Sequence, residues 1–147
     1  KTAITELRDL TRGLHPPVLT DRGLDAALSA LAGRMPIPVD IRIAPEVTGD
    51  RRPPAATESA AYFVVSEALT NAAKHSGASR ITVRIGRIRA DRLLVEVSDD
   101  GRGGAHLSPG GGLAGLAGRV AGIDGTFEVD SPPGGPTMIR AELPCES

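Results

Sequence analysis

Two neighbouring segments of the sequence alternate apolar and polar residues, and they place the strongest constraint on the fold. "RITVRIGRI" and "RLLVEVSD" are joined around Ala90 and Asp91. Successive side chains of a strand point to opposite faces, so each segment would gather its apolar residues on one face. A short connection between two such strands is typical of an antiparallel hairpin. The sequence therefore predicts a sheet built around this hairpin.

Three further segments show the same alternation. "PVDIRIAPE" places Val39, Ile41 and Ile43 on one side, which predicts a strand with one buried face. Near the end of the chain, "TFEVDS" and "TMIRAEL" flank the turn sequence "PPGGP". Proline and glycine in that number are typical of turns, so these segments predict a second hairpin.

Helical spacing marks other parts of the chain. "LTDRGLDAALSALAGRM" carries Leu24, Leu28 and Leu31 on one side, with Thr20 or Asp21 as the candidate cap. A second helix is predicted after the turn at residues 50–54, where two prolines fit a first helical turn. It should run to about residue 75, with a glycine at 77 just past its end. A short third helix should follow the glycine-dense segment that begins near residue 100.

Strands and helices mix without strict alternation along the chain. This order favours an α/β (α+β) two-layer sandwich, with a mixed, largely antiparallel sheet of about five strands and about three helices on one face. Aromatic residues make up only 2% of the sequence, as Tyr62, Phe63 and Phe127. We therefore expect a core of aliphatic side chains and alanine.

The first residues form an amphipathic segment of their own. "ITELRDLTRGLHPP" places Ile4, Leu7, Leu10 and Leu14 on a narrow apolar seam that two prolines end. Two readings stay open: the seam packs against a partner helix, or it packs on its own domain. Because the chain starts at Lys1 inside this helix, we expect it to be a fragment of a longer protein.

Composition excludes several classes of function. Seventeen Lys and Arg residues against eighteen Asp and Glu leave a formal charge of −1, so no overall field attracts nucleic acid or a membrane surface. No apolar run approaches the roughly 20 residues that a membrane span needs. The lone Cys145 excludes an internal disulfide, and the histidines are spaced too widely for a zinc pattern. His106 is expected to be exposed to solvent.

The segment "SEALTNAAKHS" carries an unusual polar stripe. Glu67, Asn71, Lys74 and His75 fall at i, i+4, i+7 and i+8, which is one face of a helix that is otherwise apolar. The stripe either is a solvated face, with its two bases favoured by the helix dipole, or faces a ligand or partner.

Two glycine-rich segments favour the ligand. "VEVSDDGRGG" puts two aspartates at a strand end before glycines that let backbone approach a ligand closely, although Asp-Asp-Gly alone is mostly a turn signal. "GGGLAGLAGRV" keeps Gly115 and Gly118 inside a helix, where each costs about 1 kcal/mol relative to alanine. We expect that a methyl group does not fit there. A glycine-rich run entering a helix N-terminus is also a ready anion site.

These three segments together resemble the ATP-binding domain shared by sensor histidine kinases, DNA gyrase, heat-shock chaperone ATPases and mismatch-repair ATPases. "EALTNAAKH" is similar to the family's N-box, and "DDGRGG" and "GGGLAGLAGR" are similar to its two glycine boxes. "KHSGAS", the short loop between the glycine boxes and "LHPPVLTDRGLDAAL" resemble the histidine kinases whose response regulators carry helix-turn-helix domains. "SPPGGPTMIRAELP" resembles the family's closing hairpin. The resemblance covers nearly the whole chain and implies the Bergerat fold. It makes residues 1–34 the end of a dimerisation helix and a linker helix, and residues 35–147 the ATP-binding catalytic domain.

The resemblance implies a role for each motif residue. Asn71 would bind Mg²⁺, Glu67 would hold a metal-bound water or act as a base, and Asp99 would accept a hydrogen bond from the adenine amine. Asp100 stands where asparagine is commoner, which leaves its role open. The resemblance places a further set of residues around ATP, at its phosphates, at its base or in the lid that covers it: Lys74, His75, Gly101, Gly103, Gly110, Gly112, Leu113, Gly115 and Thr137.

The resemblance also implies the activity and its partners. The γ-phosphoryl group of Mg·ATP would go to a histidine upstream of this chain, because His15 precedes two prolines and lacks a following acid. Partners would be the protein's own dimerisation helices and a response regulator, in a homodimer, with this fragment alone monomeric. The domain would be cytoplasmic, in a membrane-anchored or soluble bacterial kinase. An anti-sigma-factor serine kinase is the alternative, disfavoured by the upstream helix. A nucleotide-binding module without catalysis is another, disfavoured by Glu67 and Asn71.

Overall fold

The computed structural model describes residues 23–47, 53–73, 77–89, 91–101 and 112–145. The predicted seam at residues 4–14 lies outside these ranges. The elements of the described part are α3 (Leu24–Gly33), β1 (Val39–Ile43), a 3₁₀ turn η1 (Pro45–Val47), α4 (Ala55–Asn71), β2 (Ile81–Arg89), β3 (Arg92–Asp99), α5 (Gly112–Ala121), β4 (Thr126–Asp130) and β5 (Thr137–Pro144). None of the described helices is long and apolar enough to cross a membrane.

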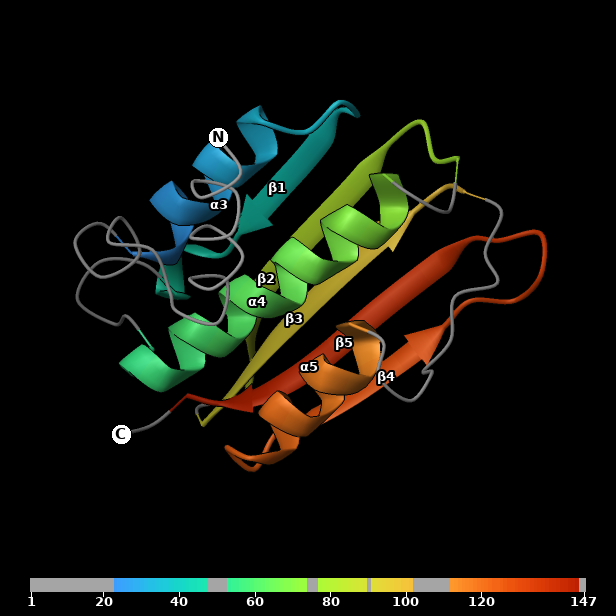
Figure 1. Cartoon of the computed structure of the whole chain (residues 1–147). Coiled ribbons are helices and arrows are strands. Elements are labelled where there is room, and N and C mark those ends of the chain that lie inside the picture. Colours follow the sequence, from blue (N-terminus) through green and yellow to red (C-terminus); the bar gives the residue numbers. More distant parts are fainter. Residues whose placement is uncertain (1–22, 48–52, 74–76, 90, 102–111, 146–147) are drawn as a thin grey trace, which may run out of the picture.

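The five strands form one sheet in the order β1-β2-β3-β5-β4. β1 runs parallel to β2, and every other pair is antiparallel. The three helices all cover the same face of this sheet (Figure 1). Both predicted hairpins, β2–β3 and β4–β5, are confirmed, and so is the two-layer sandwich with a mixed, largely antiparallel sheet.

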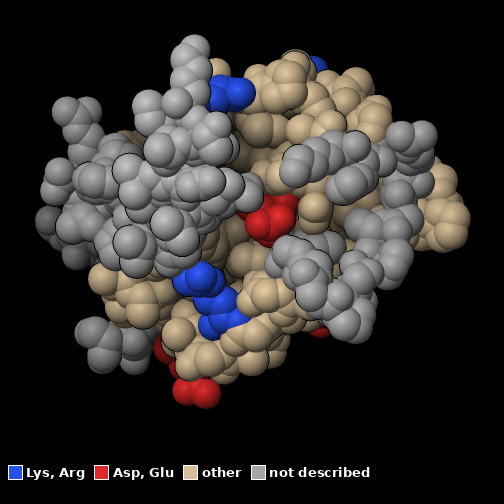
Figure 2. Space-filling model, viewed as in Figure 1, with Lys and Arg blue, Asp and Glu red and all other residues tan. Residues whose placement is uncertain are grey.

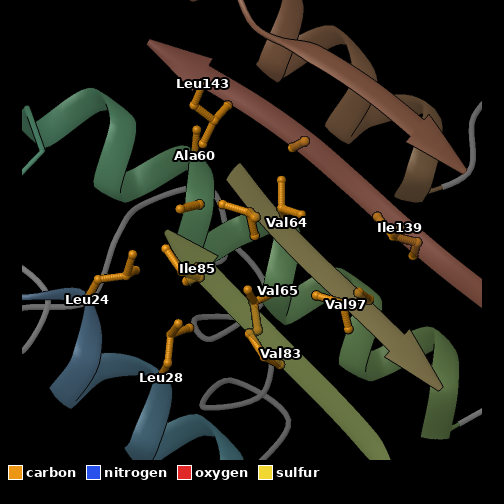
Figure 3. Close-up of a cluster of buried hydrophobic side chains, with 14 of the residues drawn as sticks. Leu24, Leu28, Ala60, Val64, Val65, Val83, Ile85, Val97, Ile139 and Leu143 are labelled. Carbon is orange, nitrogen blue, oxygen red and sulfur yellow. The ribbon is translucent and has the colours of Figure 1, made fainter. Parts of the chain in front are cut away.

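The core lies between the sheet and the helices. Every second residue of the central strands points toward the helices, as alternation requires. Figure 3 shows side chains from strands and helices meeting in one cluster. Its fully buried members include Leu28, Val64, Val65, Leu69, Ile81, Val83, Leu93, Val95, Ala141 and Leu143. The aromatic side chains are only partly buried beside this cluster, so the prediction of an aliphatic, alanine-rich core is confirmed.

Helix α3 starts later than predicted. Its N-cap is Gly23, which has a φ of 88°, and no side chain caps the helix. Glycine adopts this left-handed conformation without strain, so the turn into the helix needs no Thr20 or Asp21 cap, and that prediction is wrong. Leu24 and Leu28 are buried in the common core. The boundary drawn between residues 34 and 35 stays a prediction, although α3 packs on the same core as α4.

Helix α4 crosses the middle of the sheet and is anchored at its start. The Thr57 hydroxyl donates to the carbonyl oxygen of Pro144 at 2.5 Å, which joins the first turn of α4 to the end of β5. Pro54 is the N-cap, just before the helix rather than in its first turn. The α-helix ends at Asn71 and continues as a π-helical turn over residues 72–73. Gly77 has a φ of +64°, which suits the predicted place just beyond the helix.

Candidate functional site

Two of the predicted site residues lie in the last turns of α4. Glu67 and Asn71 are four residues apart, so their side chains leave the same face of the helix. Both are half-buried, beside the buried stripe that includes Ala68 and Leu69. No hydrogen bond or ion pair within the described ranges occupies either side chain. One carboxylate and one amide oxygen therefore stand together at the border of the core, without a structural partner among the described residues.

A second pair of polar residues lies side by side on neighbouring strands. Asp99 ends β3 and Thr137 begins β5, and the two are direct partners in the antiparallel ladder. Asp99 is 8% exposed and Thr137 is 5% exposed, so both are buried polar groups. The Thr137 and Ser131 hydroxyl oxygens are 2.6 Å apart and hydrogen-bonded. Both buried side chains have a hydrogen-bond partner, as buried polar groups generally do: Ser131 for Thr137 and a backbone N–H for Asp99.

The backbone after Asp99 holds that carboxylate in place. The Gly101 N–H donates to Oδ1 of Asp99 at 2.8 Å, and Gly101 is itself buried. This bond folds the chain tightly around the carboxylate. The predicted approach of the Gly101 backbone to a ligand stays a prediction.

These two pairs lie toward the same end of the molecule. Figure 1 shows that the end of α4, the end of β3 and the start of β5 all lie at one end of the sandwich. The first residues of α5 lie nearer to this end than its last residues do. Figure 2 shows acidic atoms at the surface near the centre of the helix-covered face. Glu67 and Asn71 of α4 thus lie toward the strand ends that carry the buried carboxylate of Asp99.

Asp100, whose role the sequence left open, binds the segment that leads into β2. Its Oδ1 accepts from the Ser79 N–H at 2.7 Å and from the Arg80 N–H at 3.1 Å, while its Oδ2 pairs with the Ser79 hydroxyl. The Ser79 hydroxyl, then the Ser79 and Arg80 N–H groups, hold the pKa of Asp100 below its ordinary value of 3.8. The stabilisation that the charged carboxylate gains from these bonds is therefore present at neutral pH and is lost only as the pH falls through this lowered pKa.

Sequence reasoning missed this contact. The available signal was Ser79, the last residue of "SGAS". It stands just before a predicted strand, and that strand pairs with the strand that ends in Asp99. Ile81 and Asp99 are partners in that ladder, so residues 79–80 and 100 continue the pairing beyond the last rung. Register at that precision is fixed by the three-dimensional pairing and not by alternation alone.

Helix α5 is attached to α4 by packing and by charge. Leu116 and Val120 are buried against the core, and the Arg119 guanidinium lies 4.3 Å from the centre of the Phe63 ring. A cation over an aromatic face adds about 0.5–1 kcal/mol at exposed sites. Gly112 is the first residue of α5 and Leu113 the second, as the predicted entry from a glycine-rich run into a helix requires.

The expectation that a methyl group would not fit at Gly115 and Gly118 is wrong for the described structure. A Cβ built at either position meets no described atom within 4 Å. Packing against described residues therefore does not explain why glycine stands inside this helix at a cost of about 1 kcal/mol each. The role of Gly115 toward a nucleotide stays a prediction. The roles of Lys74, His75, Gly103 and Gly110 also stay predictions, because these four residues lie outside the described ranges.

Comparison with known proteins agrees with this arrangement. Residues 56–147 match the family described as "Histidine kinase-, DNA gyrase B-, and HSP90-like ATPase". The sensor histidine kinase MctS of Rhizobium johnstonii is 33% identical over 97% of this chain and 32% of its own length. The sensor histidine kinase NarS of Mycobacterium tuberculosis is 32% identical over 99% of this chain and 35% of its own. The chain thus spans about a third of these relatives.

Solved structures show the same fold. The histidine kinase domain of the Erythrobacter litoralis EL346 blue-light activated histidine kinase superposes with a TM-score of 0.66, at 27% identity, over 84% of this chain and 59% of that one. The mycobacterial sensor histidine kinase MprB superposes with a TM-score of 0.58, at 25% identity, over 82% of this chain and 92% of that one. The chain belongs to the histidine kinase-, DNA gyrase B- and HSP90-like ATPase family, as an ATP-binding domain of the sensor histidine kinase type.

Proposed function

We propose that this domain binds Mg·ATP at the end of the sandwich where α4, β3 and β5 meet, and transfers the γ-phosphoryl group to a histidine outside this chain. The observation that carries the proposal is the placement of Glu67 and Asn71, both without a described partner, toward the strand ends that carry buried Asp99. Glu67 and Asn71 suit the phosphates of one nucleotide, and Asp99 suits its base.

The base is assigned to the Asp99 end. Adenine presents an exocyclic amine, and a fixed carboxylate oxygen accepts its hydrogen bond, whereas guanine places a carbonyl oxygen there. Asp99 is already oriented by the Gly101 N–H and buried against water. Thr137, its partner across the ladder, adds a hydroxyl that can donate or accept beside the base.

The phosphates are assigned to the α4 end. Mg²⁺ prefers hard oxygen ligands and keeps several waters, so one amide oxygen and one carboxylate suit it when the phosphates supply further oxygens. When bound, the ion neutralises phosphate charge during transfer. Asn71 would hold it, and Glu67, one helical turn away, would orient a coordinated water or accept a proton. Lys74, His75 and the lid glycines Gly110, Gly112 and Gly115 would contact phosphate oxygens, while Gly101 and Gly103 would let the backbone pass under the base.

The remaining partners follow from the type of domain. We assign the phosphoacceptor histidine to a dimerisation segment of the longer protein, a homodimer, and the next recipient to a response regulator receiver domain. The catalytic domain would act on the cytoplasmic side, whether or not the longer protein is anchored in a membrane. The relatives named sensor kinases support these assignments.

The test is phosphotransfer in trans. We expect this chain alone to be mostly monomeric and to acquire no label from γ-labelled ATP, because a seam this short makes only a marginal helix in water. Mixed with a separate dimerisation segment that carries a histidine, it should place an acid-labile, base-stable label on that segment. Glu67→Gln should lower the rate by roughly 10²- to 10⁴-fold if the carboxylate transfers a proton. Acid-labile label on His15 of the chain alone would contradict this assignment.

A further inference from the structure

The carboxylate of Asp100 connects two segments that the sequence separates by about twenty residues. Three donors converge on it: the N–H and hydroxyl of Ser79 and the N–H of Arg80. The Asp100 N–H donates in return to the carbonyl oxygen of Arg80 at 3.4 Å. We call these residues, Asp100, Ser79 and Arg80, the Asp100 clamp.

The clamp joins the end of β3 to residues 79–80, directly before β2. Its β3 side is the residue directly after Asp99, which is assigned to the adenine. Its other side belongs to the connection between α4, which carries Glu67 and Asn71, and the start of β2. The two residues that follow Asp99 are thus both fixed: the Gly101 N–H binds the Asp99 carboxylate, and the Asp100 carboxylate binds residues 79–80 of the α4–β2 connection.

We propose that Asp100 is a positioning residue of the nucleotide site: the clamp sets the distance between the adenine-binding end of β3 and the phosphate-binding end of α4. This inference rests on the proposed function, because it assigns the two sides to one nucleotide. A single ATP spans both sides and fits only one spacing. Binding of adenosine, which lacks phosphates, depends on that spacing much less.

The chemistry of the clamp predicts which substitutions preserve it. A carboxylate accepts all three hydrogen bonds without a donor of its own. Asparagine keeps one oxygen for the two backbone N–H groups, and its amide can donate to the Ser79 hydroxyl oxygen instead. Alanine keeps none of these bonds. Asp100→Asn should therefore retain the clamp, and Asp100→Ala should lose it.

The experiment measures dissociation constants for Mg·ATP and for adenosine by titration calorimetry, in wild type, Asp100→Ala and Asp100→Asn. Asp91→Ala is the matched control, because Asp91 is an exposed aspartate in the turn at the opposite end of β3. We expect Asp100→Ala to weaken Mg·ATP binding by roughly 5- to 10-fold more than adenosine binding, on the scale of one or two hydrogen bonds. Asp100→Asn and Asp91→Ala should keep the wild-type ratio.

Each outcome decides between the inferences. Equal losses for ATP and adenosine, or an unchanged ATP affinity in Asp100→Ala, would overturn the positioning role while leaving the proposed function intact. If the wild type binds adenosine as tightly as Mg·ATP, both the positioning role and the proposed function would be overturned. If Asp100→Ala does not fold, Ser79→Ala takes its place, since it removes only the hydroxyl contact and should shift the same ratio in the same direction by a smaller factor.

Discussion

Asn71→Ala is expected to abolish Mg-dependent nucleotide binding while the domain stays folded. The variant removes the amide oxygen assigned to the metal and leaves the phosphates without a protein-held cation. Stability should change little, because Asn71 is half-buried at the helix end and alanine is the better helix former. Titration calorimetry with and without EDTA measures the binding, and thermal unfolding measures the fold. Ser59→Ala, at a half-buried position near the other end of α4, is the matched control.

Asn71→Asp separates ligand geometry from charge. It keeps an oxygen at the same place but adds a negative charge beside the phosphates, so we expect it to lose nucleotide binding as well. Wild-type ATP affinity in Asn71→Ala would show that the metal is held elsewhere. A Ser59→Ala loss as large as that of Asn71→Ala would show that α4 simply tolerates no change.

Asp99→Asn should lower the affinity for ATP by roughly 5- to 150-fold. The asparagine oxygen can keep the bond from the Gly101 N–H, but its amide then turns a donor toward the adenine amine. Two donors that face each other in a buried site leave a polar group unpaired, at a cost of about 1–3 kcal/mol. Competition binding against a labelled ATP analogue measures the change.

The same substitution at an exposed strand end supplies the control. Asp130 is the last residue of β4 and is exposed, so Asp130→Asn should leave the ATP affinity unchanged. An unchanged dissociation constant in Asp99→Asn would move the adenine site away from the end of β3.

The sheet was largely predictable because alternation is a local property. "RITVRIGRI" and "RLLVEVSD" identified β2 and β3 and their hairpin, and "PPGGP" identified the β4–β5 turn. The strand order was not predictable in this way, since β5 lies between β3 and β4 through pairing that no local pattern encodes. The start of α3 was predicted wrongly for a related reason, because Gly23 begins this helix through its own backbone conformation. The predicted end of α4 near residue 75 lies outside the described residues, and the helix continues as a π-helical turn over residues 72–73.

The candidate site was also predictable only where local spacing places its residues. Helical spacing alone placed Glu67 and Asn71 on one face, and the ladder then put Asp99 beside Thr137, which the sequence could link only through the family resemblance. The Asp100 clamp was missed because its bonds to residues 79–80 depend on the register of β2 against β3. The two glycines of α5 were misread, because a helix glycine does not reveal from sequence alone whether it is kept for packing or for a ligand.

Thermal unfolding with nucleotide tests most directly the central claim, that this domain is a selective Mg·ATP site. Ligand at about 100 times its dissociation constant stabilises the folded state by roughly 2.7 kcal/mol, which raises Tm by several degrees in a domain of this size. We predict such a rise with Mg·ATP and little or none with Mg·GTP, because Asp99 accepts a hydrogen bond that guanine cannot donate at that position. No rise with Mg·ATP, or an equal rise with Mg·GTP, would contradict the account.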